Sequence, residues 1–201
     1  MTDYQDFFNT RPDIDFIYHY IPENSRVLDL GCGDGFLLHA LKETKNCSVQ
    51  GIDLSQKSVM TCVSKGVPVI QNDLNSGLSY FGDKSFDYVI LGQTFQQVSQ
   101  PQELIREMIR VGGESFVSLF NIAYWKMRLQ ITFQGRMPYS SKLPYEWYNT
   151  PNIHLGSISD FQNMCDKEEF KVKKISTLSQ GFLAQSFPNT FAELGVFILE
   201  D

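Results

Sequence analysis

The sequence predicts one α/β domain, in which a mostly parallel sheet carries helices on both faces. Two observations lead to this prediction. Short apolar runs of strand length alternate with amphipathic helical patterns, and the first run leads through a glycine-rich turn into a helix. The 201 residues contain no internal repeat, and this length suits a single hydrophobic core. We therefore treat residues 1–201 as one domain, with residues 1–24 as an N-terminal helical extension and residues 122–156 as an inserted segment or lid.

The first half of the chain repeats a strand–helix unit. The first helical pattern places Leu37, Leu38 and Leu41 on one face. Ser55 can cap the next helix, and Gly66 stands where that helix should end. The expected strands of this half are residues 26–30, 48–52, 67–71 and 86–91.

The second half continues this pattern and then departs from it. Pro101 suits the first turn of a helix, because its missing N–H has no partner to lose there. A strand at 115–120 and a helix at 124–134 follow. Residues 135–155 form a segment rich in Pro, Tyr and Asn, and loops of this length are usually functional. The last expected elements are a helix at 159–166 and two strands at 172–177 and 194–199, packed antiparallel at one edge of the sheet.

Composition and charge restrict the classes of partner. The formal net charge of −6 disfavours a broad nucleic-acid surface, which needs a basic face. The N-terminal residues lack the apolar run of a signal peptide, and no stretch approaches the length of a membrane span. The four cysteines show no zinc-type spacing, so we expect no metal site. These features predict a cytoplasmic protein without nucleic-acid or membrane partners.

The glycine-rich turn at residues 30–35 is the strongest candidate for a ligand site. Glycine permits unusual backbone angles and lets a ligand approach the main chain closely. The spacing is G-x-G-x-G, whereas dinucleotide sites use G-x-G-x-x-G. Asp29 and Asp34 flank the turn with negative charge, which suits a ligand that carries an ammonium and a sulfonium better than a pyrophosphate.

Further acidic residues follow the next two strands. Asp53 closes the second strand, near the spacing at which an acidic residue accepts ribose hydroxyls, and Leu54 can pack against an adenine ring. Asp73, after the third strand, can accept from the adenine amino group. Each aspartate could instead cap a helix or start a turn. Their shared place at one sheet edge favours the ligand interpretation, because open α/β sheets bind ligands there.

These motifs resemble the class I S-adenosylmethionine-dependent methyltransferases over about residues 24–121. The resemblance implies a Rossmann-like fold with a seven-stranded, mostly parallel sheet and an antiparallel edge strand. It also implies S-adenosylmethionine or S-adenosylhomocysteine as the cofactor, and places Gln93 near the amino-acid or methyl end. The implied cofactor contacts are Asp29, Gly31, Cys32, Gly33, Asp53, Leu54, Asp73, Leu74 and Gln93.

The segment from Gly135 to Leu155 is more particular. Together with residues 71–74, 86–91 and 93–94, it resembles the MetW family of methionine biosynthesis proteins, and this resemblance runs from about residue 26 to residue 165. The family is methyltransferase-like and is linked to a homoserine O-acyltransferase. The resemblance therefore implies a place in methionine biosynthesis and that acyltransferase as a partner, but no methyl acceptor.

The same segment supplies the catalytic candidates. His154 is the best candidate for a general base, and Tyr145 is a second catalytic candidate. His154 could instead hold the loop in place. Arg128 and Arg136 could bind a carboxylate or phosphate, or stay solvated. The aromatic residues fit a lid or a protein–protein patch equally well.

Two functions therefore remain from the sequence. The first is a methyltransferase that acts on an unidentified small molecule or protein, where positioning can supply most of the rate enhancement. The alternative is a non-catalytic accessory subunit that senses S-adenosylmethionine for a homoserine O-acyltransferase. A dinucleotide-linked oxidoreductase is disfavoured by the glycine spacing and the acidic flank.

Overall fold

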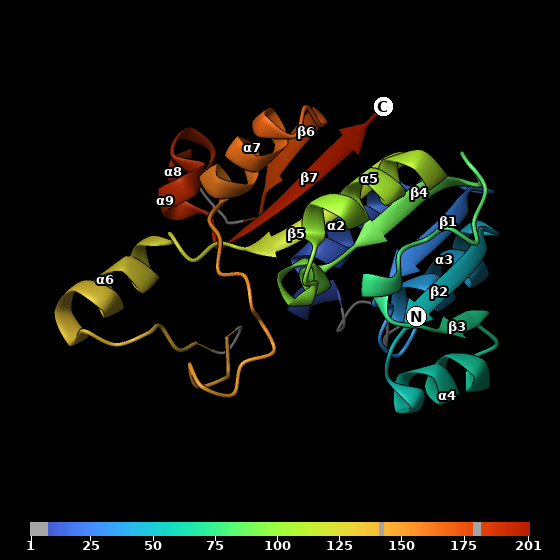
Figure 1. Ribbon diagram of the computed structural model, residues 1–201, viewed down its shortest axis with the longest axis horizontal. Helices are drawn as coiled ribbons and strands as arrows, with labels where there is room; N and C mark the ends of the chain where they lie inside the picture. The colour runs from blue at the N-terminus through green and yellow to red at the C-terminus, as the bar shows by residue number, and fades with distance from the viewer. Residues whose placement is uncertain (1–7, 141–142, 179–181) are drawn as a thin grey trace.

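The computed structural model of the chain describes residues 8–140, 143–178 and 182–201, so the first part of the predicted N-terminal extension lies outside the described residues. Its centre is a seven-stranded sheet with the order β3-β2-β1-β4-β5-β7-β6, with helices on both faces (Figure 1). The strands are β1 (Arg26–Leu30), β2 (Ser48–Asp53), β3 (Val69–Gln71), β4 (Phe86–Leu91), β5 (Gly112–Phe120), β6 (Lys171–Thr177) and β7 (Leu194–Glu200).

The direction of the strands fixes where a ligand can bind. Strands β3, β2, β1, β4 and β5 pair in parallel, whereas β7 is antiparallel to both β5 and β6. The predicted antiparallel component therefore lies at the β6 edge of the sheet. The chain order reverses between β1 and β4, which are hydrogen-bonded neighbours. Such a switch point opens a crevice at the carboxyl ends of the strands, where the glycine-rich turn begins.

The helices begin and end close to their predicted positions. Ser55 caps its helix by accepting a hydrogen bond from the Ser58 N–H at 3.3 Å. The strand predicted at residues 67–71 begins at Val69, because Pro68 has no N–H to donate to the ladder. The longer helices are α2 (Pro12–Tyr20), α3 (Phe36–Lys45), α4 (Gln56–Ser64), α5 (Pro101–Val111), α6 (Trp125–Gln134) and α7 (Ile158–Lys167). The sequence did not predict the short elements η1 (Leu74–Ser76), η2 (Gln93–Gln97), α8 (Phe182–Ser186) and α9 (Pro188–Phe191).

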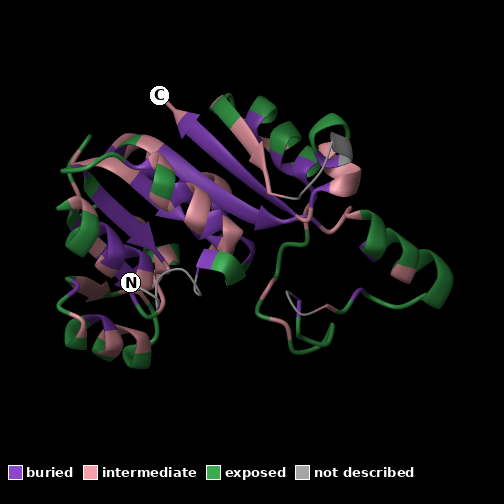
Figure 2. Ribbon diagram, turned by 180° about the vertical axis from the view of Figure 1, so that it is seen from behind, coloured by how far each residue is buried: buried purple, intermediate pink, exposed green. Residues whose placement is uncertain are grey.

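Two apolar cores lie on opposite faces of the sheet, and the inner strands between them are largely buried (Figure 2). Alternate strand residues point to opposite faces, so Val27 packs with α2 and α3, whereas Leu28 packs with α5 and α7. Helix α2 contributes Ile14 and Ile17 to its core and both are buried. Within the predicted N-terminal extension, α2 therefore packs against the body of the domain. This packing brings the start of α2 to the sheet.

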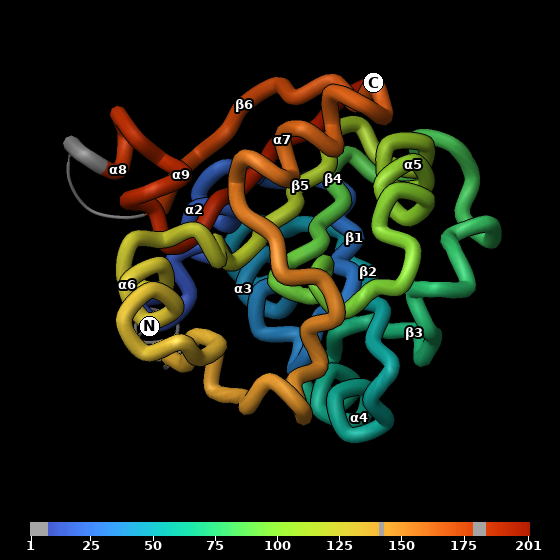
Figure 3. The backbone as a smooth tube through the Cα atoms, turned by 60° about the vertical axis from the view of Figure 1, so that its left-hand side comes forward, coloured from blue at the N-terminus to red at the C-terminus, as the bar shows by residue number. Residues whose placement is uncertain are grey.

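Residues 122–156, which we call the arm, leave the end of β5 and project from the body (Figures 1 and 3). The arm consists of α6 and the long segment that returns to α7. Its own core is small, with buried residues Phe120, Met127, Leu143 and Leu194 at the junction with the sheet. The described side chains of the outer arm are mostly exposed (Figure 2).

Candidate functional site

The glycine-rich turn adopts the backbone that its sequence predicts. Gly31 and Gly33 have φ values of +73° and +56°, which L side chains rarely adopt. The N–H groups of Gly31 and Cys32 donate to the Ile52 carbonyl at 2.8 and 3.0 Å, so the turn is tied to β2. A Cβ at Gly33 would meet no atom within 4 Å, so the main chain there faces open space into which a ligand can fit.

Asp53 connects the turn to α4. Its Oδ2 accepts from the Gly33 N–H at 2.8 Å, and its Oδ1 accepts from the Ser55 N–H at 2.9 Å. The carboxylate therefore has the structural role that the sequence left open. Two carboxylate oxygens offer about four acceptor positions, so Asp53 keeps capacity for two ribose hydroxyls.

Cys32 packs behind the turn. Its Sγ lies 3.9 Å from the Sγ of Cys62, and the Cys62 thiol donates to the Gly33 carbonyl at 3.3 Å. A Cβ at Gly51 would come within 2.6 Å of the Cys32 sulfur, so this glycine makes room for the thiol. Burial raises the pKa of both thiols, which therefore stay protonated at neutral pH. The side chain of Cys32 supports the turn, and its contribution toward a ligand comes from the backbone.

Asp29 places a buried carboxyl at the end of β1, with 6% of the residue exposed. Burial raises its pKa to about 7, against the opposing charge of Arg11, and the carboxylates of Asp53 and Asp13 raise it further. The carboxyl group thus changes charge within the physiological pH range. A ligand ammonium beside it would supply the missing positive charge.

Arg11 and Asp13 belong to this edge, although sequence reasoning missed them. The Nε and Nη2 atoms of Arg11 donate to the two carboxylate oxygens of Asp13 at 3.0 and 2.9 Å. Ser118 Oγ donates to Asp13 at 2.9 Å, and Gln93 Nε2 lies 3.5 Å from the same oxygen. Burial opposes the charged form, but the hydrogen bonds from Arg11 and Ser118 hold the pKa of Asp13 below its usual value. The only local sequence signal was an Arg two residues before an Asp at the start of a helix.

The predicted adenine end lies beyond β2 and β3. Leu54 is 65% exposed, which leaves an apolar surface free at the end of β2. Asp73 caps η1, since its Oδ1 accepts from the Asn75 backbone and side-chain N–H groups at 2.9 and 2.8 Å. Leu74 is partly buried against the core. One Asp73 oxygen thus serves the local turn, and the other has no hydrogen bond among the described residues.

Gln93 lies beside a cavity of about 330 Å³ at the other end of this edge. Tyr145 lines the same cavity, so the structure brings this candidate to the Gln93 end of the site. The cavity is lined by Thr10, Arg11, Gln93, Gln96, Gln97, Phe120, Leu143, Pro144, Tyr145 and Asn152.

His154 lies elsewhere, in a neighbouring hollow of about 350 Å³ that Gln96, Asp160 and Phe161 also line. His154 is exposed, and Gln96 holds its backbone. The His154 N–H donates to the Gln96 carbonyl at 3.0 Å, and Gln96 Nε2 donates to the His154 carbonyl at 3.2 Å. The two catalytic candidates therefore line different hollows on either side of Gln96.

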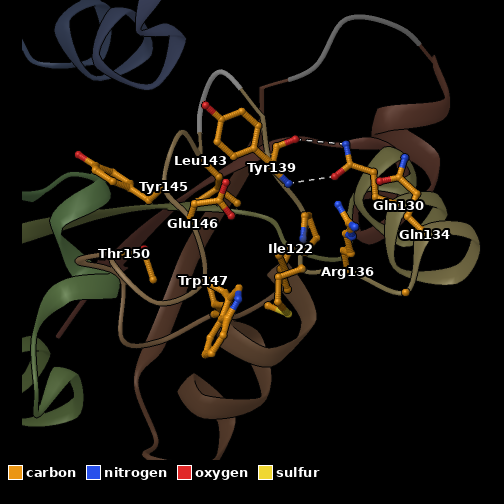
Figure 4. A pocket seen from close by; sticks show the side chains of 14 residues that line it. Ile122, Gln130, Gln134, Arg136, Tyr139, Leu143, Tyr145, Glu146, Trp147 and Thr150 are labelled. Atoms are coloured by element: carbon orange, nitrogen blue, oxygen red, sulfur yellow. Dashed lines mark hydrogen bonds between the residues drawn. The ribbon is translucent and has the colours of Figure 1, made fainter.

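The arm encloses a third hollow, of about 730 Å³ (Figure 4). Gln130 on α6 braces it by two hydrogen bonds to the backbone of Tyr139, at 3.2 and 3.0 Å. Arg136, Glu146 and Trp147 line it, so both signs of charge and a large ring face one space. None of the predicted cofactor residues lines this hollow.

The described residues show neither a membrane-spanning helix nor a metal-type cluster. No described helix has both the length and the apolar character that a membrane crossing requires. Among residues 8–140, 143–178 and 182–201, no three His, Cys, Asp or Glu side chains are grouped as a metal site.

The chain is similar to known proteins in both sequence and fold. Among curated proteins, the chain is 37% identical over 161 residues to the bifunctional methionine biosynthesis protein MetXA/MetW of Rhodopirellula baltica, which covers 76% of this chain. It is 32% identical over 108 residues to a ubiquinone biosynthesis O-methyltransferase of Paracidovorax citrulli, which covers 49% of this chain. The matches span 26% and 45% of these relatives, so the chain corresponds to about a quarter of the first and under half of the second.

Solved structures share the fold at low sequence identity. A SAM-dependent methyltransferase from Archaeoglobus fulgidus superposes with a TM-score of 0.71 at 14% identity, and the match covers 96% of this chain and 93% of that one. An S-adenosylmethionine-dependent methyltransferase from Mesorhizobium loti gives 0.68 at 18% identity, with 94% and 96% covered. The fold is the Rossmann-like class I methyltransferase fold. The family model described as methionine biosynthesis protein MetW matches residues 11–199, so the chain belongs to the MetW family.

Proposed function

We propose that the chain binds S-adenosylmethionine at the β1–β4 sheet edge and transfers its methyl group to an unidentified acceptor within methionine biosynthesis. The observation that carries this proposal is the juxtaposition of the open Gly33 backbone with the Asp53 carboxylate, 2.8 Å apart, beside the buried Asp29. The two solved structures described above are S-adenosylmethionine-dependent methyltransferases, which supports the same cofactor.

Each residue at this edge of the sheet would contact a different part of the cofactor. Asp29 would accept from the ammonium group, and its raised pKa means that this pairing requires loss of a proton from the carboxyl. Asp53 would accept from the ribose hydroxyls. Leu54 would pack on the adenine ring, and the free oxygen of Asp73 would accept from the adenine amino group. When bound, S-adenosylmethionine supplies a methyl group on a positively charged sulfur.

The cavity beside Gln93 is our candidate for the acceptor site. Gln93 and Tyr145 present an amide and a hydroxyl there, which can orient a small polar acceptor. Tyr145 is thus the better placed of the two catalytic candidates. His154 lies beyond Gln96, so its use as a base would require the arm to move; its backbone bonds to Gln96 favour the loop-holding role.

Calorimetry tests the cofactor proposal directly. S-adenosylmethionine and S-adenosylhomocysteine should bind and NAD should not, and Asp53→Ala should weaken binding at least tenfold. Asp166→Ala, an exposed carboxylate on α7, is the matched control and should leave affinity unchanged. Binding of NAD in place of S-adenosylmethionine would refute the assignment.

The fused relative favours a second function. Its name joins MetXA and MetW in one polypeptide, which keeps a domain like this one beside a second methionine-biosynthesis component. Together with the family resemblance, this supports an accessory subunit that binds a homoserine O-acyltransferase and senses S-adenosylmethionine for it. Association of the two purified proteins tests this function, and its dependence on S-adenosylmethionine tests the sensing.

A further inference from the structure

We propose that the arm is the docking surface for the acyltransferase, and that it engages an acidic face of that partner which surrounds an apolar cleft. This proposal rests on the accessory function above and adds the surface that performs it. Among the described residues, eleven of the sixteen exposed large hydrophobic side chains lie in the arm. A concentration of exposed apolar side chains in one segment is typical of interaction sites on proteins.

Helix α6 leaves apolar side chains uncovered by the described residues of the chain. It buries Met127 against the body, whereas Leu129, Ile131 and Phe133 are 44, 46 and 80% exposed. The apolar residues of α6 are spread around the helix rather than gathered on one buried stripe. Leu129, Ile131 and Phe133 therefore offer exposed apolar surface that a partner can cover.

The loop adds aromatic residues on the other side of the arm hollow. Trp147 and Tyr148 are 71 and 70% exposed, with ring centroids 5.7 Å apart in an edge-to-face pair. Trp147 also lines the 730 Å³ hollow opposite Arg136 (Figure 4). Trp, Tyr and Arg carry most of the energy at protein interfaces, and a concave space lets a partner side chain insert between them.

The charge of the arm specifies the chemistry of the partner. The described residues of the arm include three Lys and Arg residues and one Asp or Glu residue, a formal +2, whereas the whole chain carries −6. Opposite potentials steer association and suppress wrong partners. An apolar cleft with an acidic rim is therefore the complement of this surface. The fused relative, which joins MetXA and MetW, is the reason that we assign this cleft to the acyltransferase.

The base of the arm is fixed to the cofactor edge. The Gln96 carbonyl accepts from the N–H groups of Ile153 and His154 at 2.9 and 3.0 Å, and its Oε1 accepts from the Phe120 N–H at 3.3 Å. Gln96 belongs to η2, the same short helix as Gln93. A partner held by the arm would therefore sit next to the site that we assign to the cofactor.

The test measures binding between the purified chain and the purified acyltransferase of the same source. The double variant Phe133→Ser with Trp147→Ala should weaken binding at least tenfold. The matched control, Met60→Ser with Val63→Ser, removes two side chains that are 66 and 63% exposed on α4 and should leave affinity unchanged. Arg136→Glu should also weaken binding, and more so at low salt. The Tm and the affinity for S-adenosylhomocysteine should stay unchanged in every variant.

Three results would overturn the proposal. Binding of the acyltransferase to the double variant as tightly as to the native chain would refute the arm surface and leave the accessory function standing. Binding of S-adenosylhomocysteine but of no acyltransferase by the native chain would refute both the surface and the accessory function. Arm-dependent self-association by sedimentation velocity, or arm-dependent binding to anionic phosphatidylserine vesicles, without acyltransferase binding, would assign the surface to another occupant.

Discussion

Lowering the pH from 8 to 6 should weaken S-adenosylhomocysteine binding about tenfold, because Asp29 must be ionised to pair with the ligand ammonium. Its pKa is raised to about 7 by burial. A carboxyl with this pKa is mostly charged at pH 8 and mostly protonated at pH 6. If the bound ammonium returns the pKa toward its ordinary value of 3.8, each pH unit well below 7 costs about tenfold in affinity.

Calorimetry in two buffers of different ionisation enthalpy measures this effect. The dissociation constant should rise as the pH falls, and binding at pH 6 should release close to one proton. S-adenosylhomocysteine keeps the ammonium and is chemically stable, so it is the suitable ligand. A dissociation constant that is flat between pH 6 and 8, or proton uptake on binding, would refute the reasoning.

Asp29→Asn is the control for the same carboxyl. It should remove the pH dependence and most of the affinity. It should also stabilise the free protein at pH 8 by up to about 4 kcal/mol. The buried carboxyl destabilises the folded state when it is ionised, and this destabilisation grows as the pH rises from the unfolded pKa to the folded pKa. Below about pH 4 the carboxyl is protonated in both states, so the gain should vanish there.

Three further predictions concern the supports of the site. Arg11→Ala leaves a fully buried carboxylate unpaired and should cost about 3 kcal/mol of stability in urea denaturation, whereas Arg26→Ala breaks an exposed pair and should cost under about 1 kcal/mol. Gly31→Ala should lower the Tm of the protein more than Gly33→Ala, because the new Cβ at position 31 would lie 2.4 Å from a threonine oxygen. Gly33→Ala should mainly weaken cofactor binding. Equal losses of Tm in the two variants would contradict this prediction. Gln96→Ala removes the side-chain hydrogen bond to the His154 carbonyl but keeps the two bonds that the Gln96 backbone carbonyl accepts, so it should accelerate proteolysis within the arm with a smaller effect on Tm. An unchanged cleavage rate would show that the side-chain bond does not hold the arm.

The strands and the cofactor edge could be predicted because their signals are local. Each strand is an apolar run with a polar end, and parallel pairing aligns those ends. This is why Asp29 and Asp53, which are far apart in the chain, end neighbouring strands. The glycine spacing also predicts where the turn has positive φ angles.

The partners of Asp13 and Gln96 could not be predicted, because their contacts join distant parts of the chain. The hydrogen bond from Ser118 to Asp13 spans 105 positions, and that from Gln96 to His154 spans 58. No periodicity encodes such pairs. For the same reason the sequence could name His154 as a candidate base without locating it relative to Gln93, and the structure places the two residues in separate hollows.

The structure also explains why the sequence could not decide whether the arm is a lid or a protein–protein interface. The inner arm, at Leu143 and Tyr145, lines the cavity beside Gln93, whereas the outer arm carries Phe133 and Trp147 on exposed surface. Both surfaces belong to one segment, anchored at Gln96. A partner that binds the outer arm would therefore bias the position of the inner arm over the cavity. By linkage, a ligand in the cavity that favours one arm position must change partner affinity by the same factor.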